Sequence, residues 1–203
     1  MLVAFDVEYR NKDDKEKFDP NDLDVDKIGI LLKSENTTLI QKIMGEPYDQ
    51  LDSETLVYIF EPEMMQVVPV LMYALAKVVP EDIIILSHNY EYDSQYIDIL
   101  SYIRENVPNF IEIRTKNLYS VIVIINGKIV SLIDTAKFEY KPLKKKLNAL
   151  RSKRMGKLEH YLINDLIETV NLINVYSEIE KIIELGKWTI ENANYIVGGS
   201  MYD

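Results

Sequence analysis

The chain begins with MLVAFDVEYR (residues 1–10), an apolar run that leads directly into two acidic residues. Leu2–Val7 has the β-branched and aromatic composition of a strand. Residues two apart on a strand point to the same face of a sheet, so we expect Asp6 and Glu8 to converge. Carboxylates this close repel each other and raise one pKa, a cost that a divalent cation between them would reverse. For the pair taken alone, two solvated acids at a frayed strand end are the better explanation.

The composition excludes several classes of protein. The 203 residues suit one domain, and 47% of them are hydrophobic, enough for a sizeable core. The absence of cysteine excludes disulfides and thiolate metal sites, and it fits an intracellular, cytoplasmic protein. The N-terminus lacks the basic start of a signal peptide, and the longest apolar runs, such as Val121–Ile125, are too short to span a bilayer. The net charge of −10 argues against a non-specific nucleic-acid coat protein, but it is compatible with an enzyme that acts on nucleic acid at an acidic metal site.

Hydrophobic patterning predicts an α/β protein with a mixed sheet flanked by helices. Three strands precede the first helix, so we expect the sheet to begin as an antiparallel meander. No Gly-rich loop follows the first strand, which counts against a doubly wound nucleotide-binding sheet. Asn126-Gly127 between two apolar runs is a strong hairpin signal. The predicted strands are Leu2–Val7, Lys27–Lys33, Leu56–Phe60, Ile83–Ser87, Ser120–Ile125 and Lys128–Ile133, and the predicted helices are Glu63–Val79, Ser94–Asn106 and Leu158 to about Leu185, with polar loops at Asn11–Asp26 and Lys33–Glu54.

Two further acidic stretches lie far along the chain. The first, HNYEYDSQYI (residues 88–97), follows a short apolar strand and places Asp93 near the start of a helix. An N-cap explains this acid equally well, and His88 and Asn89 suit a turn. The second, EHYLINDLIETVNL (residues 159–172), places Asp165 on a helix, one turn after Tyr161. An acid on an exposed helix face is the usual explanation for such a residue.

Taken together, these three stretches resemble the motifs of the DEDD superfamily of 3′–5′ exonucleases, which has an RNase H-like fold. That family carries Asp-x-Glu on its first strand, Asn-x-x-x-Asp at a middle helix, and Tyr-x-x-x-Asp or His-x-x-x-x-Asp on a late helix. The resemblance covers Leu2 to about Tyr176. The matching positions are Asp6, Glu8, Asn89, Asp93, Tyr161 and Asp165.

The first motif and the loop after it look most like the exonuclease domain of family-B DNA polymerases. Two features depart from that pattern. Asn89 and Asp93 are spaced as in the proofreading-subunit and RNase D branches, whereas the polymerase domains usually have one residue more. His160 also stands five residues before Asp165, so the chain satisfies the His version of the last motif too. Neighbours on a helix point about 100° apart, so only one of the two can face the metals. We favour Tyr161, because Tyr9-Arg10 follows Glu8 where the His branch usually has Thr-Thr-Gly.

The resemblance implies hydrolysis of phosphodiester bonds with two Mg²⁺ or Mn²⁺ ions as cofactors, releasing nucleoside 5′-monophosphates from the 3′ end. Asp6 would bridge the ions, Glu8 and Asp165 would hold the ion that activates water, and Asp93 would act through the other ion. Tyr161 would orient the attacking water, with His160 as the alternative, and Asn89 would position the scissile end. The basic run Lys141–Lys157 could contact substrate phosphates, although a solvated segment explains each lysine equally well. Its substrate-binding candidates are Lys144, Lys145 and Arg151.

The domain organisation expected from this resemblance is an exonuclease domain over residues 1–185 and a tail over residues 186–203. The preferred substrate is single-stranded or frayed DNA, and RNA 3′-end trimming remains an alternative. A second alternative is a non-catalytic exonuclease-like subunit, or a fragment of a family-B polymerase complex. A replication or repair protein is the expected protein partner, and no membrane association is expected.

Overall fold

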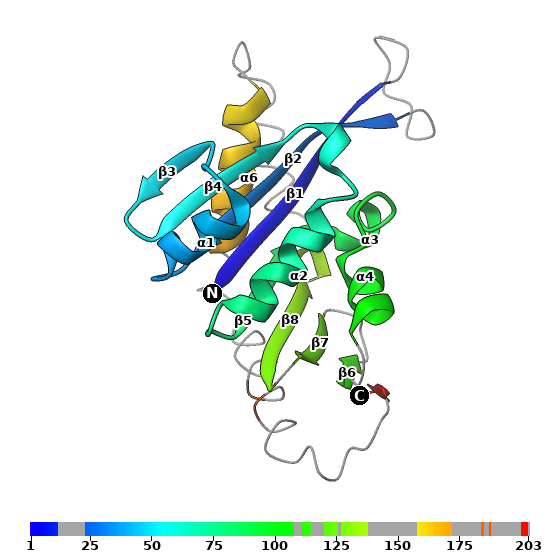
Figure 1. Cartoon of the computed structure of the whole chain (residues 1–203). Helices are drawn as coiled ribbons and strands as arrows, with labels where there is room; N and C mark the ends of the chain where they lie inside the picture. Colours follow the sequence, from blue (N-terminus) through cyan, green and yellow to red (C-terminus); the bar gives the residue numbers. More distant parts are fainter. Residues whose placement is uncertain are drawn as a thin grey trace.

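The computed structural model describes residues 1–11, 23–107, 111–114, 120–125, 127–137, 158–171, 184, 187 and 200–202. Within them, nine strands form one sheet in the order β3-β4-β2-β1-β5-β8-β7-β6-β9 (Figure 1). The strands are β1 Leu2–Asn11, β2 Leu23–Lys33, β3 Asp49–Asp52, β4 Thr55–Phe60, β5 Ile83–Ser87, β6 Ile111–Arg114, β7 Ser120–Ile125, β8 Lys128–Asp134 and β9 Ser200–Tyr202. The helices are α1 Thr37–Met44, α2 Val68–Val78, α3 Tyr90–Asp93, α4 Ile99–Asn106 and α6 Leu158–Asn171, with 3₁₀ turns η1 Pro62–Met64 and η2 Thr135–Lys137.

Strand direction divides the sheet into two kinds of pairing. Strands β1, β5 and β8 run parallel to one another, and Phe5, Ser87 and Asp134 are neighbours across them. Strand β2 is antiparallel to both β1 and β4, and β7 is antiparallel to β8. The carboxyl ends of the three parallel strands therefore meet at one edge, where loops from different strands come together.

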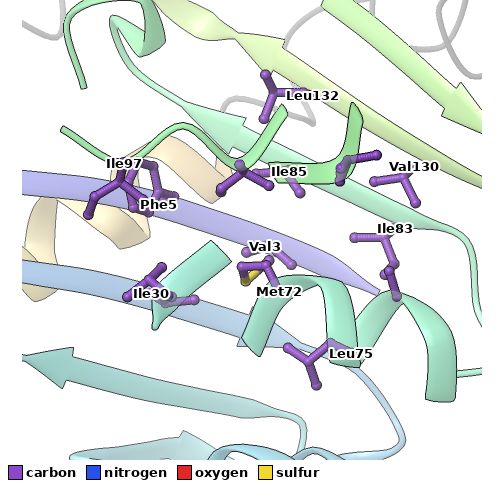
Figure 2. Close-up of a cluster of buried hydrophobic side chains, with 14 of the residues drawn as sticks. Val3, Phe5, Ile30, Met72, Leu75, Ile83, Ile85, Ile97, Val130 and Leu132 are labelled. Carbon is purple, nitrogen blue, oxygen red and sulfur yellow. The ribbon is translucent and has the colours of Figure 1, made fainter. Parts of the chain in front are cut away.

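Helices cover both faces of the sheet. On one face, α1, α2 and α4 bury the main core, in which Phe5 and Ile85 of the sheet meet Met72 and Leu75 of α2 (Figure 2). On the opposite face, Leu162 and Leu166 of α6 pack on Ala4, Leu31 and Val57. The predicted α/β class, with a mixed sheet flanked by helices, is confirmed.

Several predicted boundaries were wrong for identifiable reasons. The expected loop Lys33–Glu54 contains α1 and β3. Helix α1 is only eight residues long, but Leu39, Ile40, Ile43 and Met44 share one face, so its periodicity was overlooked, whereas the four residues of β3 are all exposed and show no buried face. The helix predicted over Glu63–Val79 begins at Val68, after a separate 3₁₀ turn that starts at Pro62. The helix predicted to begin at Ser94 instead begins at Ile99, where the Asp98 side chain accepts a hydrogen bond from the Ser101 backbone.

Two other predicted elements, the hairpin and the last helix, are observed in the described residues. The hairpin strands β7 and β8 pair as predicted around Gly127, whose φ of 77° suits the turn. The last predicted helix is observed as α6 over Leu158–Asn171, and most of its predicted continuation toward Leu185 lies outside the described residues. Within the described part of the chain, none of the helices has the length and apolar character needed to cross a membrane.

The packing of α6 depends on Gly29 of β2. A Cβ at this position would lie 2.7 Å from Leu162 Cγ and 2.9 Å from Leu166 Cδ1, closer than side-chain carbons can approach. Gly29 is also the direct partner of Asp6 across β1 and β2. The missing side chain therefore lets α6 lie close to the sheet beside the first acidic residue.

We expect Gly29→Ala to destabilise the fold by about 1–3 kcal/mol, because the added methyl group overpacks the contact between β2 and α6. Urea unfolding monitored by circular dichroism measures this loss. In a Leu162→Ala background the same substitution should cost less, because its closest neighbour is gone. An equal cost in both backgrounds would show that the contact with α6 is not the cause.

Candidate metal centre

The first two acids of the site come from β1. Ala4, Asp6 and Glu8 alternate with Val3, Phe5 and Val7, so they point to the face that α6 covers. Asp6 lies opposite Gly29, and Glu8 lies opposite Lys27. The register of β1 on β2 shifts after Glu8, which marks a β-bulge beside the two acids.

The third acid is supplied by α6. Asp165 is buried on this helix, and one oxygen from each of Asp6, Glu8 and Asp165 lies within 4.8 Å of the other two. Oxygen ligands on opposite sides of a single Mg²⁺ are about 4 Å apart, because each lies ~2 Å from the ion. The three carboxylates therefore have nearly the spacing that one small divalent cation requires, and their hard oxygens match Mg²⁺ or Mn²⁺.

The fourth predicted acid, Asp93, lies beside these three. It ends α3, directly after β5, and only 4% of its surface is exposed. The Tyr9 hydroxyl donates a hydrogen bond to Asp93 Oδ1 at 2.8 Å, and the Ser87 hydroxyl donates one to Oδ2 at 3.3 Å. Its negative charge, like those of Glu8 and Asp165, raises the pKa of Asp6. All four predicted acids thus gather at one edge of the sheet.

The crowding of carboxylates shifts their proton affinity upward. Burial raises the pKa of Asp6 well above its ordinary value, and the charges of Asp93, Glu8 and Asp165 raise it further. Burial likewise raises the pKa of Asp93 to about 7, although the hydrogen bonds from Tyr9 and Ser87 oppose the shift. Both shifts favour the protonated carboxyl groups, and a bound divalent cation would oppose them.

His88 and Asn89 form the turn between β5 and α3. Asn89 has a left-handed backbone with φ of 74°, and its N–H donates a hydrogen bond to Asp134 Oδ1 at 2.9 Å. His88 Nδ1 lies 3.0 Å from Thr135 Oγ1, and burial lowers the pKa of His88 to about 4. The predicted turn is thus observed, and binding of substrate by Asn89 stays a prediction.

The two candidates on α6 differ in exposure. Tyr161 is buried, with 4% of its surface exposed, whereas the neighbouring His160 is exposed. Tyr161 precedes Asp165 by one helical turn, so both lie on the side of α6 that packs on the protein. The substrate-binding candidates Lys144, Lys145 and Arg151 lie outside the described residues.

Sequence reasoning missed Asp134 and Tyr9. Asp134 is a buried acid at the end of β8, beside Ser87, and its Oδ1 accepts hydrogen bonds from the backbones of Asn89 and Ala136. Its place directly after the predicted strand Lys128–Ile133 marked only an acid at a strand end, and its contact with Asn89 left no signal in the sequence. Tyr9 carried no signal, because its contact with Asp93 joins residues 84 positions apart.

Comparison of the chain with protein-family models, with curated proteins and with solved structures finds no match. The functional assignment therefore depends on the geometry of the site and on the sequence motifs.

We expect the contribution of Asp93 to the stability of the metal-free protein to fall as pH rises from 5 to 8. The raised pKa of Asp93 stabilises the fold fully below its ordinary value near 4, and this contribution is lost as pH rises through about 7. The free energy of unfolding of the Asp93→Asn variant should be greater than that of the wild type by on the order of 2 kcal/mol at pH 8, and by less at pH 5. Urea unfolding in EDTA measures both proteins, and the difference cancels the contribution of His88. A difference independent of pH would contradict the assignment to Asp93.

Proposed function

We propose that this protein is a metal-dependent 3′–5′ exonuclease of the DEDD type, with an RNase H-like fold. The observation that carries the proposal is the convergence of Asp6, Glu8 and Asp165 within 4.8 Å, with buried Asp93 alongside. Three separated sequence motifs predict these four acids as one group. The strand order β4-β2-β1-β5-β8, in which β2 is antiparallel to its neighbours β4 and β1 while β1, β5 and β8 run parallel, is compatible with that fold.

The donor set fits the cofactor that this activity needs. Asp6, Glu8 and Asp165 would hold a divalent ion directly, and Asp93 would reach a second ion from the end of α3. Mg²⁺ or Mn²⁺ bound there supplies a nucleophilic hydroxide at neutral pH and shields the charge that develops on the phosphate. The chain's contribution is a rigid arrangement of oxygens on β1 and α6, two elements held together by packing.

The remaining residues would orient the reactants. Tyr161 is buried one turn before Asp165, so its phenol lies on the side of α6 that faces the sheet. The phenol would hold the attacking water by a hydrogen bond rather than remove its proton, because a tyrosine pKa near ~10 makes it a poor base. Asn89, fixed at the turn by Asp134, would position the 3′ end of the strand.

A 5′-labelled single-stranded DNA oligonucleotide tests the activity directly. With Mg²⁺ or Mn²⁺ we expect a ladder that shortens from the 3′ end, and a matched RNA oligonucleotide establishes the sugar preference. Asp6→Ala should abolish the ladder and leave the fold intact or slightly more stable without metal, because it removes charge repulsion. Asp49→Ala, at an exposed acid on β3, is the matched control and should retain activity.

No shortening of DNA or RNA by the wild-type protein over a range of metals would overturn the proposal, and it would favour a non-catalytic subunit. An Asp6→Ala protein that is unfolded would instead assign this residue a structural role. Thermal unfolding of each variant, followed by circular dichroism, separates the two results.

We expect Tyr161→Phe to slow hydrolysis by roughly 10–100-fold, because the attacking water loses an orienting hydrogen bond. His160→Ala should have little effect, since this side chain is exposed. Single-turnover rates at saturating metal compare the two variants. The reverse ranking would assign the protein to the His branch of the superfamily.

A further inference from the structure

We propose that Tyr9 is a positioning residue that, together with Ser87, sets the orientation of the Asp93 carboxylate for the metal centre. This inference rests on the proposed function and deepens it. Tyr9 donates a hydrogen bond to Asp93 Oδ1 at 2.8 Å, and Ser87 donates one to Oδ2 at 3.3 Å. Both residues lie outside the motif positions that pointed to the four acids, and neither was among the predicted site residues.

Asp93 needs such support because of its place in the fold. Asp6 and Glu8 lie on a strand within the sheet, and Asp165 lies on a helix of 14 residues. Asp93 instead ends a helix of only four residues, which follows a turn with left-handed backbone at Asn89. A side chain on so short an element is fixed mainly by its own hydrogen bonds, and groups around a metal centre must hold their geometry within about 0.5 Å.

The two hydroxyl groups approach Asp93 from adjacent strands. Ser87 ends β5 and is the parallel partner of Phe5 on β1, while Tyr9 lies farther along β1, beyond the acids. An ionised carboxylate offers about four acceptor positions, so two hydroxyl donors leave others for a metal or a metal-bound water. The hydrogen bonds therefore fix the direction of the carboxylate without occupying it completely.

The Tyr9 ring is itself held in place. Its centroid lies 5.1 Å from that of Tyr92 and 5.0 Å from that of Tyr96, with interplanar angles of 76° and 53°. Such inclined contacts between aromatic rings are favourable and restrict the ring. Because Tyr9 and Glu8 are neighbours on β1, they point to opposite faces, and the same strand supplies metal ligands on one face and a support for Asp93 on the other.

The test compares full-length wild type, Tyr9→Phe, Ser87→Ala and Tyr96→Phe. Tyr9→Phe keeps the ring and its packing and removes only the hydroxyl. Tyr96→Phe is the matched control, since it removes a hydroxyl from the neighbouring ring. We expect Tyr9→Phe to weaken Mn²⁺ binding, measured by electron paramagnetic resonance, by roughly tenfold, in the range seen for residues that orient metal ligands. Ser87→Ala should act in the same direction, and Tyr96→Phe should bind Mn²⁺ as the wild type does.

Two readouts separate positioning from general support of the fold. The melting temperature of Tyr9→Phe in EDTA should stay close to that of the wild type. The metal concentration needed for half-maximal cleavage of the oligonucleotide should rise. Mn²⁺ binding equal to that of the wild type would overturn the role of Tyr9 and leave the proposed exonuclease untouched. A wild-type protein that binds no Mn²⁺ would overturn both.

Discussion

The close approach of α6 to β1 and β2 is the constraint on which the candidate site depends. Asp165 can meet Asp6 and Glu8 only if the helix lies near the sheet surface, and Gly29 opposite Asp6 leaves the space for it. The apolar contacts of Leu162 and Leu166 with Ala4, Leu31 and Val57 hold the helix there. Burial of Leu162 and Leu166, each contributing about 1.5–3 kcal/mol, stabilises the contact that brings like charges together.

Strand β1 therefore contributes to both the core and the candidate site, through its two opposite faces. Val3, Phe5 and Val7 of β1 bury apolar surface in the main core, whereas Asp6 and Glu8 place carboxylates on the other face. Burial, and after it repulsion from the other three acids, raises the pKa of Asp6 and disfavours its charged form. Clusters of mutually destabilising charges in a well-packed scaffold are typical of functional sites, because a bound cation supplies the missing opposite charge.

Hydrogen bonds across the ends of the parallel strands hold the middle motif in position. The carboxylate of Asp134 on β8 accepts the N–H of Asn89, and Thr135 contacts His88 and donates to the Ser87 carbonyl. Ser87 and Tyr9 then contact Asp93 itself. A turn that joins β5 to a four-residue helix is thus tied to both neighbouring strands, which makes it a defined part of the site.

The sequence by itself determined the α/β class, most of the sheet strands and the four acids, because hydrophobic periodicity and motif spacing are local properties. It also ranked Tyr161 over His160, in agreement with their burial. It missed β3, whose four residues are all exposed, and the short helix α1, although the apolar residues of α1 share one face, and it gave no role to Gly29, Tyr9 or Asp134. Only the tertiary structure decided these three, because each acts through a partner that lies distant in the chain: Leu162 for Gly29, Asp93 for Tyr9 and Asn89 for Asp134. Contacts of this kind are set by how strands and helices pack, and no local pattern of residues encodes them.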